Sequence, residues 1–183
     1  MKKYKTISKA EYYFKLKDLI VFASYETNDT IVKLSTAIAQ NNLKTVIFNL
    51  RDSLKQELKL ILDKDELTEM IYIDDKTNID IKYIVDKCNE LSADYDNLYI
   101  MIDYENELKH KGNDVTYKLK QLSKKLNTNV IVTTQINADL DIKELKNKGL
   151  VKSADVVVLS NDEQKLTILA KNKYGKIGII PDE

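Results

Sequence analysis

Short runs of β-branched and aromatic residues alternate along this chain with longer stretches in which apolar residues recur every three or four positions. Runs of this length and composition are typical of strands. They lie at 19–22, 45–48, 70–73, 98–102, 130–134, 155–159 and 166–170. The intervening stretches have the 3.6-residue period of helices with one apolar face. Examples are 31–38, 54–62, 81–91 and 115–126.

This alternation predicts an α/β fold with a doubly wound, mainly parallel sheet and helices on both of its faces. The runs LYIMI (98–102) and VIVTT (130–134) are apolar on both sides, which is typical of central strands covered by helices on both faces. Right-handed crossovers then make successive strands parallel. The last segment differs, because two short strands flank a turn at 172–175 and predict a C-terminal antiparallel hairpin.

Composition and charge narrow the class of protein. The chain has 183 residues, which suits one domain over 1–183 that includes a basic N-terminal extension at 1–17. Its 29 basic and 29 acidic residues cancel, so bulk charge does not attract nucleic acid. A single cysteine excludes an internal disulfide, and we find no apolar run long enough to cross a membrane and no signal-type segment. We therefore expect a cytoplasmic protein with no membrane partner.

Candidate functional residues lie where the expected strands end, because ligands bind doubly wound sheets at the carboxyl ends of the strands. Ser24 follows the first strand, Asp103 the fourth and Gln135 the fifth. The stretch LYIMIDY, an apolar strand that closes on Asp103, matches the Walker B pattern. In that pattern the carboxylate holds a magnesium-bound water beside nucleotide phosphates. An aspartate that caps the turn after a buried strand is the structural alternative.

Seven segments, taken in order, resemble the successive sequence blocks of the RecA-like motor domain of DnaB-type replicative helicases. They are DLIVFAS…TIVKLSTAIAQ, TVIFNL, MIYIDDKTNIDIKYIVDKCNEL, LYIMIDY, LKQLSKKLNTNVIVTTQIN, ELKNKGLVKSADVVVL and ILAKNKYGKIG, and they cover 18–180. The resemblance implies a RecA-like fold and a function connected with DNA replication. We expect no counterpart of the family's separate N-terminal collar domain and linker, and we expect such a small, collarless relative in a phage or plasmid.

The phosphate-binding loop of that family, G/A-x-x-x-x-G-K-[ST], has lost its binding residues in this sequence. An ungapped match places Ser24 first and Asp29, Thr30 and Ile31 at the Gly, Lys and Ser/Thr positions. In a working loop the glycine lets the backbone approach the phosphates, the lysine neutralises their charge, and the hydroxyl binds Mg²⁺. A carboxylate about 5 Å from a phosphate costs roughly 3 kcal/mol per phosphate charge at an effective dielectric of about 20. The helix N-terminus offsets at most about 1–2 kcal/mol of this. Asn28 or Asp29 instead suits the N-cap of the helix, where its side chain would fill the anion site.

At other positions that are functional in the family, this sequence has replaced some residues and kept others. Arg51 stands where the family has the glutamate that polarises the attacking water. Asp103 and Gln135 match the Walker B aspartate and the glutamine that senses the terminal phosphate. Lys171 and Lys173 match the arginine-finger-like basic pair that the family projects into a neighbouring subunit's site, although Lys173 lacks the bidentate fork of arginine. For these retained residues, ordinary turn and surface roles are the alternative.

Three further features are weighed in the same way. Lys109, Lys111 and Lys118 lie where the family's DNA-facing loops begin, but a solvated helix face is the alternative because no aromatic residues alternate with the lysines. His110 has no second His or Cys near it in the sequence, so we expect no metal site. Cys88 shares a helical apolar face and is expected in the core.

Three functions remain open. The first is a catalytically inactive module, a pseudo-ATPase without a cofactor, that acts in DNA replication or its regulation by docking onto a helicase ring, a loader or another copy of itself. The second is a divergent active helicase or translocase subunit that binds ATP and Mg²⁺ through Asp103, Gln135 and a lysine from elsewhere, such as Lys33 or a neighbour's Lys171. The third is a module that binds single-stranded DNA through 109–125.

Overall fold

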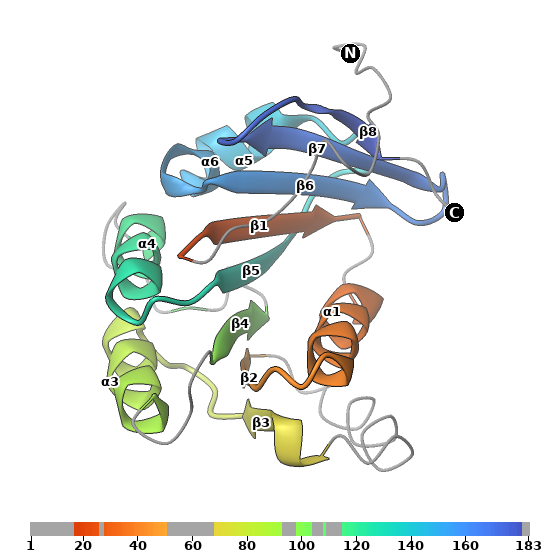
Figure 1. The fold of residues 1–183 in the computed structure, drawn as a ribbon. Helices are drawn as coiled ribbons and strands as arrows, with labels where there is room; N and C mark the ends of the chain where they lie inside the picture. The colour runs from red at the N-terminus through yellow and green to blue at the C-terminus, as the bar shows by residue number, and fades with distance from the viewer. Residues whose placement is uncertain are drawn as a thin grey trace.

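An eight-stranded sheet, in the order β3-β2-β4-β5-β1-β6-β7-β8, forms the centre of the molecule (Figure 1). The structure, a computed structural model, describes residues 17–25, 28–50, 68–92, 98–103, 108 and 115–180, without the side chains of 28, 29 and 68. All seven expected strands are present, with ends shifted by at most two residues. The strands are β1 (Leu19–Ser24), β2 (Thr45–Asn49), β3 (Ile71–Asp74), β4 (Tyr99–Asp103), β5 (Val130–Gln135), β6 (Val156–Asn161), β7 (Leu166–Asn172) and β8 (Gly178–Ile180).

The first six strands are parallel to one another, and the last two are antiparallel to their neighbours. β1 pairs with β5 and β6, and β2 pairs with β3 and β4, all in parallel. The two sets are joined because β4 also pairs in parallel with β5. β7 pairs antiparallel with β6, and β8 with β7. The expected mainly parallel sheet with a C-terminal antiparallel hairpin is therefore confirmed.

Helices cover both faces of this sheet, as the sequence pattern predicts (Figure 1). Helix α1 packs on one face, and α3 to α6 pack on the other. The elements are α1 (Asn28–Gln40), a short 3₁₀ helix η2 (Thr68–Met70), α3 (Ile81–Leu91), α4 (Val115–Lys125), α5 (Ile142–Asn147) and α6 (Leu150–Ser153). The helix expected within 54–62 lies outside the described residues.

Period-two alternation in the strands builds the two faces of the core. In β4, Met101 packs under α1, whereas Ile100 and Ile102 on either side of it pack under α3 and α4. Side chains of adjacent strand residues point to opposite faces, so a strand covered on both sides must be apolar throughout. This explains why LYIMI and VIVTT have no polar alternation until their carboxyl ends.

Local sequence signals fix the helix ends and the core positions. Asp80 caps α3 by accepting a hydrogen bond of 2.9 Å from the backbone N–H of Tyr83, and Asp141 caps α5 in the same way from Lys143. Cys88 is fully buried in the core, as expected, and burial raises the pKa of its thiol to about 12.

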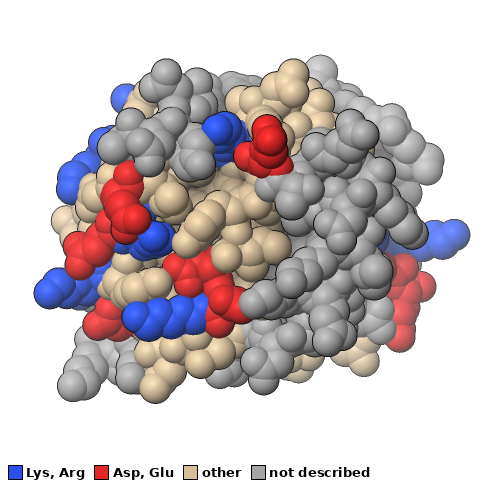
Figure 2. Space-filling model, turned by 90° about the horizontal axis from the view of Figure 1, so that it is seen from below, with Lys and Arg blue, Asp and Glu red and all other residues tan. Residues whose placement is uncertain are grey.

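Two properties of the described residues, their surface charge and the character of their helices, bear on function. Figure 2 shows the face at the β3 edge, where acidic and basic side chains of the described residues are interspersed rather than gathered by sign. Among the described residues, no helix combines the length and the apolar character needed to span a membrane.

Candidate functional site

The carboxyl ends of three neighbouring parallel strands bring Ser24, Asp103 and Gln135 to one edge of the sheet. β5 lies between β1 and β4, so residues that end these strands are neighbours although they are far apart in sequence. Ser24 pairs directly with Gln135 in the β1/β5 register. Alternation places all three on the face covered by α1, because Ile20 and Met101, at even spacing from Ser24 and Asp103, pack into the α1 cluster. The candidate residues at this edge thus share one face.

Asp103 is fully buried at this edge and is held by a neighbouring strand. The hydroxyl of Thr133 in β5 donates a hydrogen bond of 2.7 Å to Asp103 Oδ1. The backbone carbonyl of Asp103 accepts from the N–H of Leu50, at 3.4 Å, which links the ends of β4 and β2. Sequence reasoning missed Thr133, although a threonine near the end of an otherwise apolar run indicates that a buried polar group needs a hydrogen-bond partner there. The hydrogen bond fixes the orientation of the carboxylate.

The phosphate-loop positions carry an apolar side chain where the family has its magnesium ligand. Helix α1 begins at Asn28, which agrees with a helix start at this point of the sequence. Ile31, matched to the Ser/Thr position, is fully buried between α1 and the sheet, and Thr30 is half-buried. A buried aliphatic side chain cannot coordinate Mg²⁺, so Ile31 does not fit the role of the magnesium ligand at this position. The side chains of Asn28 and Asp29 lie outside the described part, so their capping role stays a prediction.

Lys148 brings a cation to the same edge, a contact that sequence reasoning missed. Lys148 Nζ donates to the backbone carbonyl of Gln135 and to Glu144 Oε1, both at 2.9 Å. Glu144 also accepts the N–H of Asn137 at 3.1 Å, which fastens the start of α5 to the loop after β5. Burial works to raise the pKa of Glu144, but the hydrogen bonds from Lys148 and Asn137 outweigh it and lower the pKa. The contact joins residues 13 positions apart, which no local motif predicts.

Lys33, the lysine considered as a substitute for the missing phosphate ligand, forms an ion pair within the chain. Its Nζ lies 3.3 Å from Asp162 Oδ2 in the turn after β6. Both side chains are well exposed, at 65% and 49%, so the pair is screened by water.

Lys171 lies at the opposite edge of the sheet, at the amino end of β6. A β-bulge lies between the pairs Val157/Lys171 and Val158/Leu169, and it turns Lys171 toward α6 instead of the α1 face. Lys171 Nζ donates to backbone carbonyls at the end of α6, including that of Val151 at 2.8 Å and that of Ala154. Burial is the main cause of the lowered pKa of Lys171.

Lys173 and Lys120 share one buried carboxylate at this opposite edge. Lys173 Nζ lies 3.1 Å from Asp155 Oδ1, and Lys120 Nζ contacts Asp155 Oδ2. The N–H of Leu19 also donates to Asp155 Oδ2, at 2.8 Å. Burial works to raise the pKa of Asp155, and the hydrogen bonds from Lys120, Leu19 and Lys173 outweigh it, so the pKa lies below its usual value. Two of the quoted sequence blocks, ELKNKGLVKSADVVVL with Asp155 and ILAKNKYGKIG with Lys173, are thus joined in space.

The remaining candidate residues are only partly placed. Arg51, Lys109, Lys111 and His110 lie outside the described residues, whereas Lys118 is exposed on α4. Within the described ranges, no group of three or more His, Cys, Asp or Glu side chains could hold a metal ion.

Comparisons with known proteins agree with the fold described above. The family model described as "DnaB-like helicase C terminal domain" matches residues 12–181. A solved structure described as an "ATPase Domain" is similar with a TM-score of 0.72 at 16% identity, over 91% of this chain and 81% of that chain. A second, "The Structure Of A DnaB-Like Replicative Helicase And Its Interactions With Primase", has a TM-score of 0.69 at 15% identity, over 91% of this chain and 55% of that chain.

No curated protein sequence matches the chain. The two solved structures share its RecA-like fold, and the family model covers nearly its whole length. The resemblance seen in the sequence blocks is confirmed, and the chain belongs to the family of DnaB-like helicase C-terminal domains.

Proposed function

We propose that this chain is a helicase-related module that binds no nucleotide and acts in DNA replication or its regulation by docking onto another protein. The single observation that carries the proposal is the burial of Ile31, fully enclosed at the position that should supply the magnesium-binding hydroxyl. Asp29 and Thr30 stand beside it where the family has glycine and lysine. The matched positions therefore supply neither the lysine that neutralises a triphosphate nor the hydroxyl that binds Mg²⁺ in the family's loop.

The positions retained at the carboxyl edge have a structural role that needs no nucleotide. Asp103 accepts from Thr133 and ties β4 to β5, and the carbonyl of Gln135 accepts from Lys148 and ties β5 to the turn after α5. Such contacts keep the sheet edge and its helices in register after the ligand-binding residues are gone. This supports a module that preserved the fold and lost the chemistry.

A protein partner is the second part of the proposal. The similar DnaB-like replicative helicase of known structure interacts with primase, which supports protein docking as a function for relatives of this fold. A replicative helicase ring, its loader or a second copy of this chain are the partners we propose.

Calorimetry with ATP and Mg²⁺ tests the loss of nucleotide binding. We expect no binding heat from the wild-type chain at millimolar ATP. The variant Asp29→Gly/Thr30→Lys/Ile31→Thr should bind more tightly than the wild type, because it restores the missing ligands. Micromolar binding by the wild type that Asp103→Asn abolishes would contradict the proposal and identify the chain as a divergent active ATPase.

The active alternative has one structural argument in its favour. Ser24, Asp103 and Gln135 share a face at the carboxyl edge, which is where a nucleotide-binding site of this fold would lie. Under that alternative ATP and Mg²⁺ are ligands, and a cation must come from Lys33, from Lys148 or from a neighbouring subunit. The calorimetric experiment distinguishes the two functions directly.

A further inference from the structure

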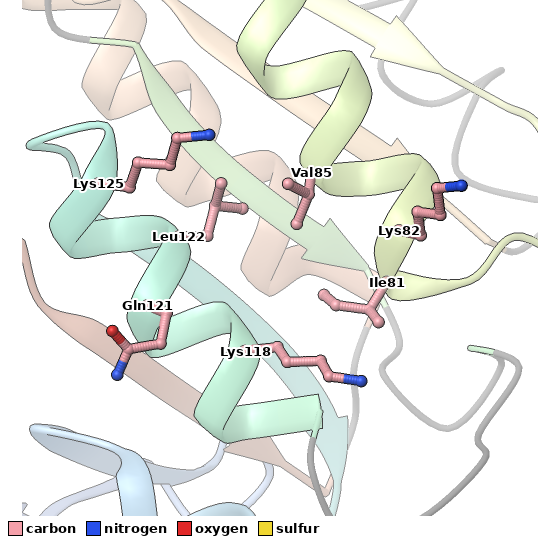
Figure 3. Close-up of a pocket in the computed structure, with 7 residues that line it drawn as sticks. All are labelled: Ile81, Lys82, Val85, Lys118, Gln121, Leu122 and Lys125. Atoms are coloured by element: carbon pink, nitrogen blue, oxygen red, sulfur yellow. The ribbon is translucent and has the colours of Figure 1, made fainter.

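A groove lies between α3 and α4, on the face of the sheet opposite α1 (Figure 3). Its volume is about 460 Å³. Val85 and Leu122 point toward one another from the two helices, and Ile81 lies one turn before Val85, so the floor is aliphatic. Ile81 and Val85 are half-buried, whereas Leu122 belongs to the buried core below. The groove is therefore an extension of the core that remains open to the outside.

Lysines surround this apolar floor. The groove is lined by Ile81, Val85 and Leu122, together with Lys82, Lys118, Lys125 and Gln121. Among the described residues its lining thus has three formal positive charges and no carboxylate, in a chain whose net charge is zero. Among the described residues, none of the three lysines forms an ion pair with a carboxylate. Asp86 follows Lys82 by one turn on α3 but does not line the groove.

Spacing along the two helices matches the repeat of a helical ligand. The α4 residues are at i, i+3, i+4 and i+7 and follow one stripe for about two turns, whereas Ile81 and Val85 on α3 are at i and i+4 and span about one turn, with Lys82 next to Ile81. Grooves between parallel helices take amphipathic helices whose apolar residues recur at i, i+3, i+4 and i+7. The surrounding lysines select the charge of the residues that flank that stripe.

We propose that the α3/α4 groove is the docking surface of this module, and that it takes an acidic amphipathic helix of a partner protein. Apolar side chains of that helix pack on Ile81, Val85 and Leu122. Its Asp and Glu residues lie beside Lys82, Lys118 and Lys125. The inference rests on the docking role proposed above and names its surface and the chemistry of its partner.

Charge and side-chain type argue against other occupants. The chain's own residues 1–16 contain five lysines and one glutamate, so they have the same sign as the groove. Single-stranded nucleic acid uses aromatic side chains on which bases stack, whereas the apolar floor here is aliphatic. An apolar floor with cations around it fits an acidic helix better than it fits a phosphate backbone.

Fluorescence anisotropy with designed peptides tests the proposal. The probe is a labelled 18-residue helical peptide with Leu at i, i+3, i+4 and i+7 and Glu at the flanking positions. A scrambled peptide of the same composition and a labelled oligothymidylate serve as comparison ligands. We expect the amphipathic peptide to bind the wild-type chain at least tenfold more tightly than the scrambled peptide, about the discrimination that the loss of a few contacts produces.

Charge reversal gives the matched variants. Lys118→Glu/Lys125→Glu should weaken peptide binding at least tenfold, whereas Lys146→Glu/Lys152→Glu, the same charge change at exposed positions on α5 and α6, should change it less than about twofold. A peptide with Lys in place of Glu should bind the Lys118→Glu/Lys125→Glu variant more tightly than it binds the wild type. Circular dichroism checks that every variant is folded, and Val85→Gln provides a second perturbation that leaves the charges unchanged.

Several results would overturn the proposal. They are equal binding of the scrambled peptide, equal binding to both charge-reversal variants, or displacement of the peptide by oligothymidylate, which would assign the surface to nucleic acid. Loss of a dimer in sedimentation on Lys118→Glu/Lys125→Glu would assign it to a second copy. The anisotropy assay contains no nucleotide, so its failure would not affect the proposed absence of ATP binding. Detection of ATP binding by calorimetry would likewise not change the outcome of the peptide experiment.

Discussion

Replacing Asp155 by asparagine removes the charge of the buried carboxylate at the amino edge of the sheet while keeping its size. The side chain of Asp155 is only 6% exposed, and that of its partner Lys120 is 11% exposed. The substitution leaves the Lys120 ammonium buried beside the carbonyl of Lys17, without the carboxylate that it contacts in the wild type. Lys173, half exposed, can turn to water instead.

The expected loss in unfolding free energy follows from these exposures. Removing one partner of a buried ion pair costs about 3–5 kcal/mol, because the remaining charge stays desolvated. The contact with Lys173 is worth at most about 1 kcal/mol, as for other exposed pairs. We expect Asp155→Asn to lower the unfolding free energy by about 3–6 kcal/mol, which a domain in the middle or upper part of the typical range of about 5–15 kcal/mol survives.

Urea denaturation measures this change. The midpoint should fall without a change in the slope of free energy against urea. Asp162→Asn is the matched control, because it removes the exposed partner of Lys33 and should cost about 0–1 kcal/mol. Equal effects of the two substitutions would refute the reasoning. In the double variant Asp155→Asn/Lys120→Met the loss should be smaller than the sum of the single losses.

The pH dependence of this difference has a definite sign. The pKa of Asp155 is lowered in the folded chain, so its ionisation stabilises the folded state above the unfolded-state pKa of about 3.9. The difference in unfolding free energy between wild type and Asp155→Asn should stay constant from about pH 5 to pH 7. It should shrink as the pH falls below about 4 and through the folded-state pKa, and a difference that grows on acidification would contradict the assignment.

Three further predictions concern other positions. Ile31→Thr buries a hydroxyl in the α1 cluster and should lower the unfolding free energy by about 1–3 kcal/mol, whereas Ile31→Val should lower it by about 0.5–1.5 kcal/mol. Urea denaturation compares the two variants. An unchanged unfolding free energy in Ile31→Thr would mean that the site is more open than described. Cys88 should resist thiol reagents at pH 8 until urea unfolds the chain, because burial raises the pKa of its thiol to about 12, and fast labelling of the folded chain would contradict this. Asp80→Ala removes the α3 N-cap and should cost about 1 kcal/mol in thermal or urea unfolding, whereas Asp86→Ala on the exposed side of the same helix should stay within about 0.5 kcal/mol.

The fold could be predicted because its signals are local and repeated. Each buried strand is a short apolar run, and each described helix of three or more turns has an apolar face. These elements differ from the expectation only at their ends, as at Met70, which lies in η2 instead of β3. Burial on both faces requires such runs to be apolar throughout, which makes each strand recognisable in the sequence.

The candidate site could be predicted only in part, because its contacts join distant segments. The strand pattern places Ser24, Asp103 and Gln135 at strand ends, and the parallel topology brings them to one edge. No pattern indicates that Thr133 holds Asp103 or that Lys148 reaches Gln135, since these pairs lie on different elements. The β-bulge that turns Lys171 toward α6 has no sequence signal either. One inserted residue reverses the face of the sheet to which the following side chains point, so strand alternation alone does not place Lys171.

The separation between the two edges of the sheet restricts how copies of this chain could complete each other. β1 has six residues and spans about 17 Å, so the lysines at its amino edge cannot reach Ser24 in their own chain. A second copy can bring these lysines to Ser24 when it contacts the first head to tail, and repetition of such a contact gives either a closed ring or an open filament.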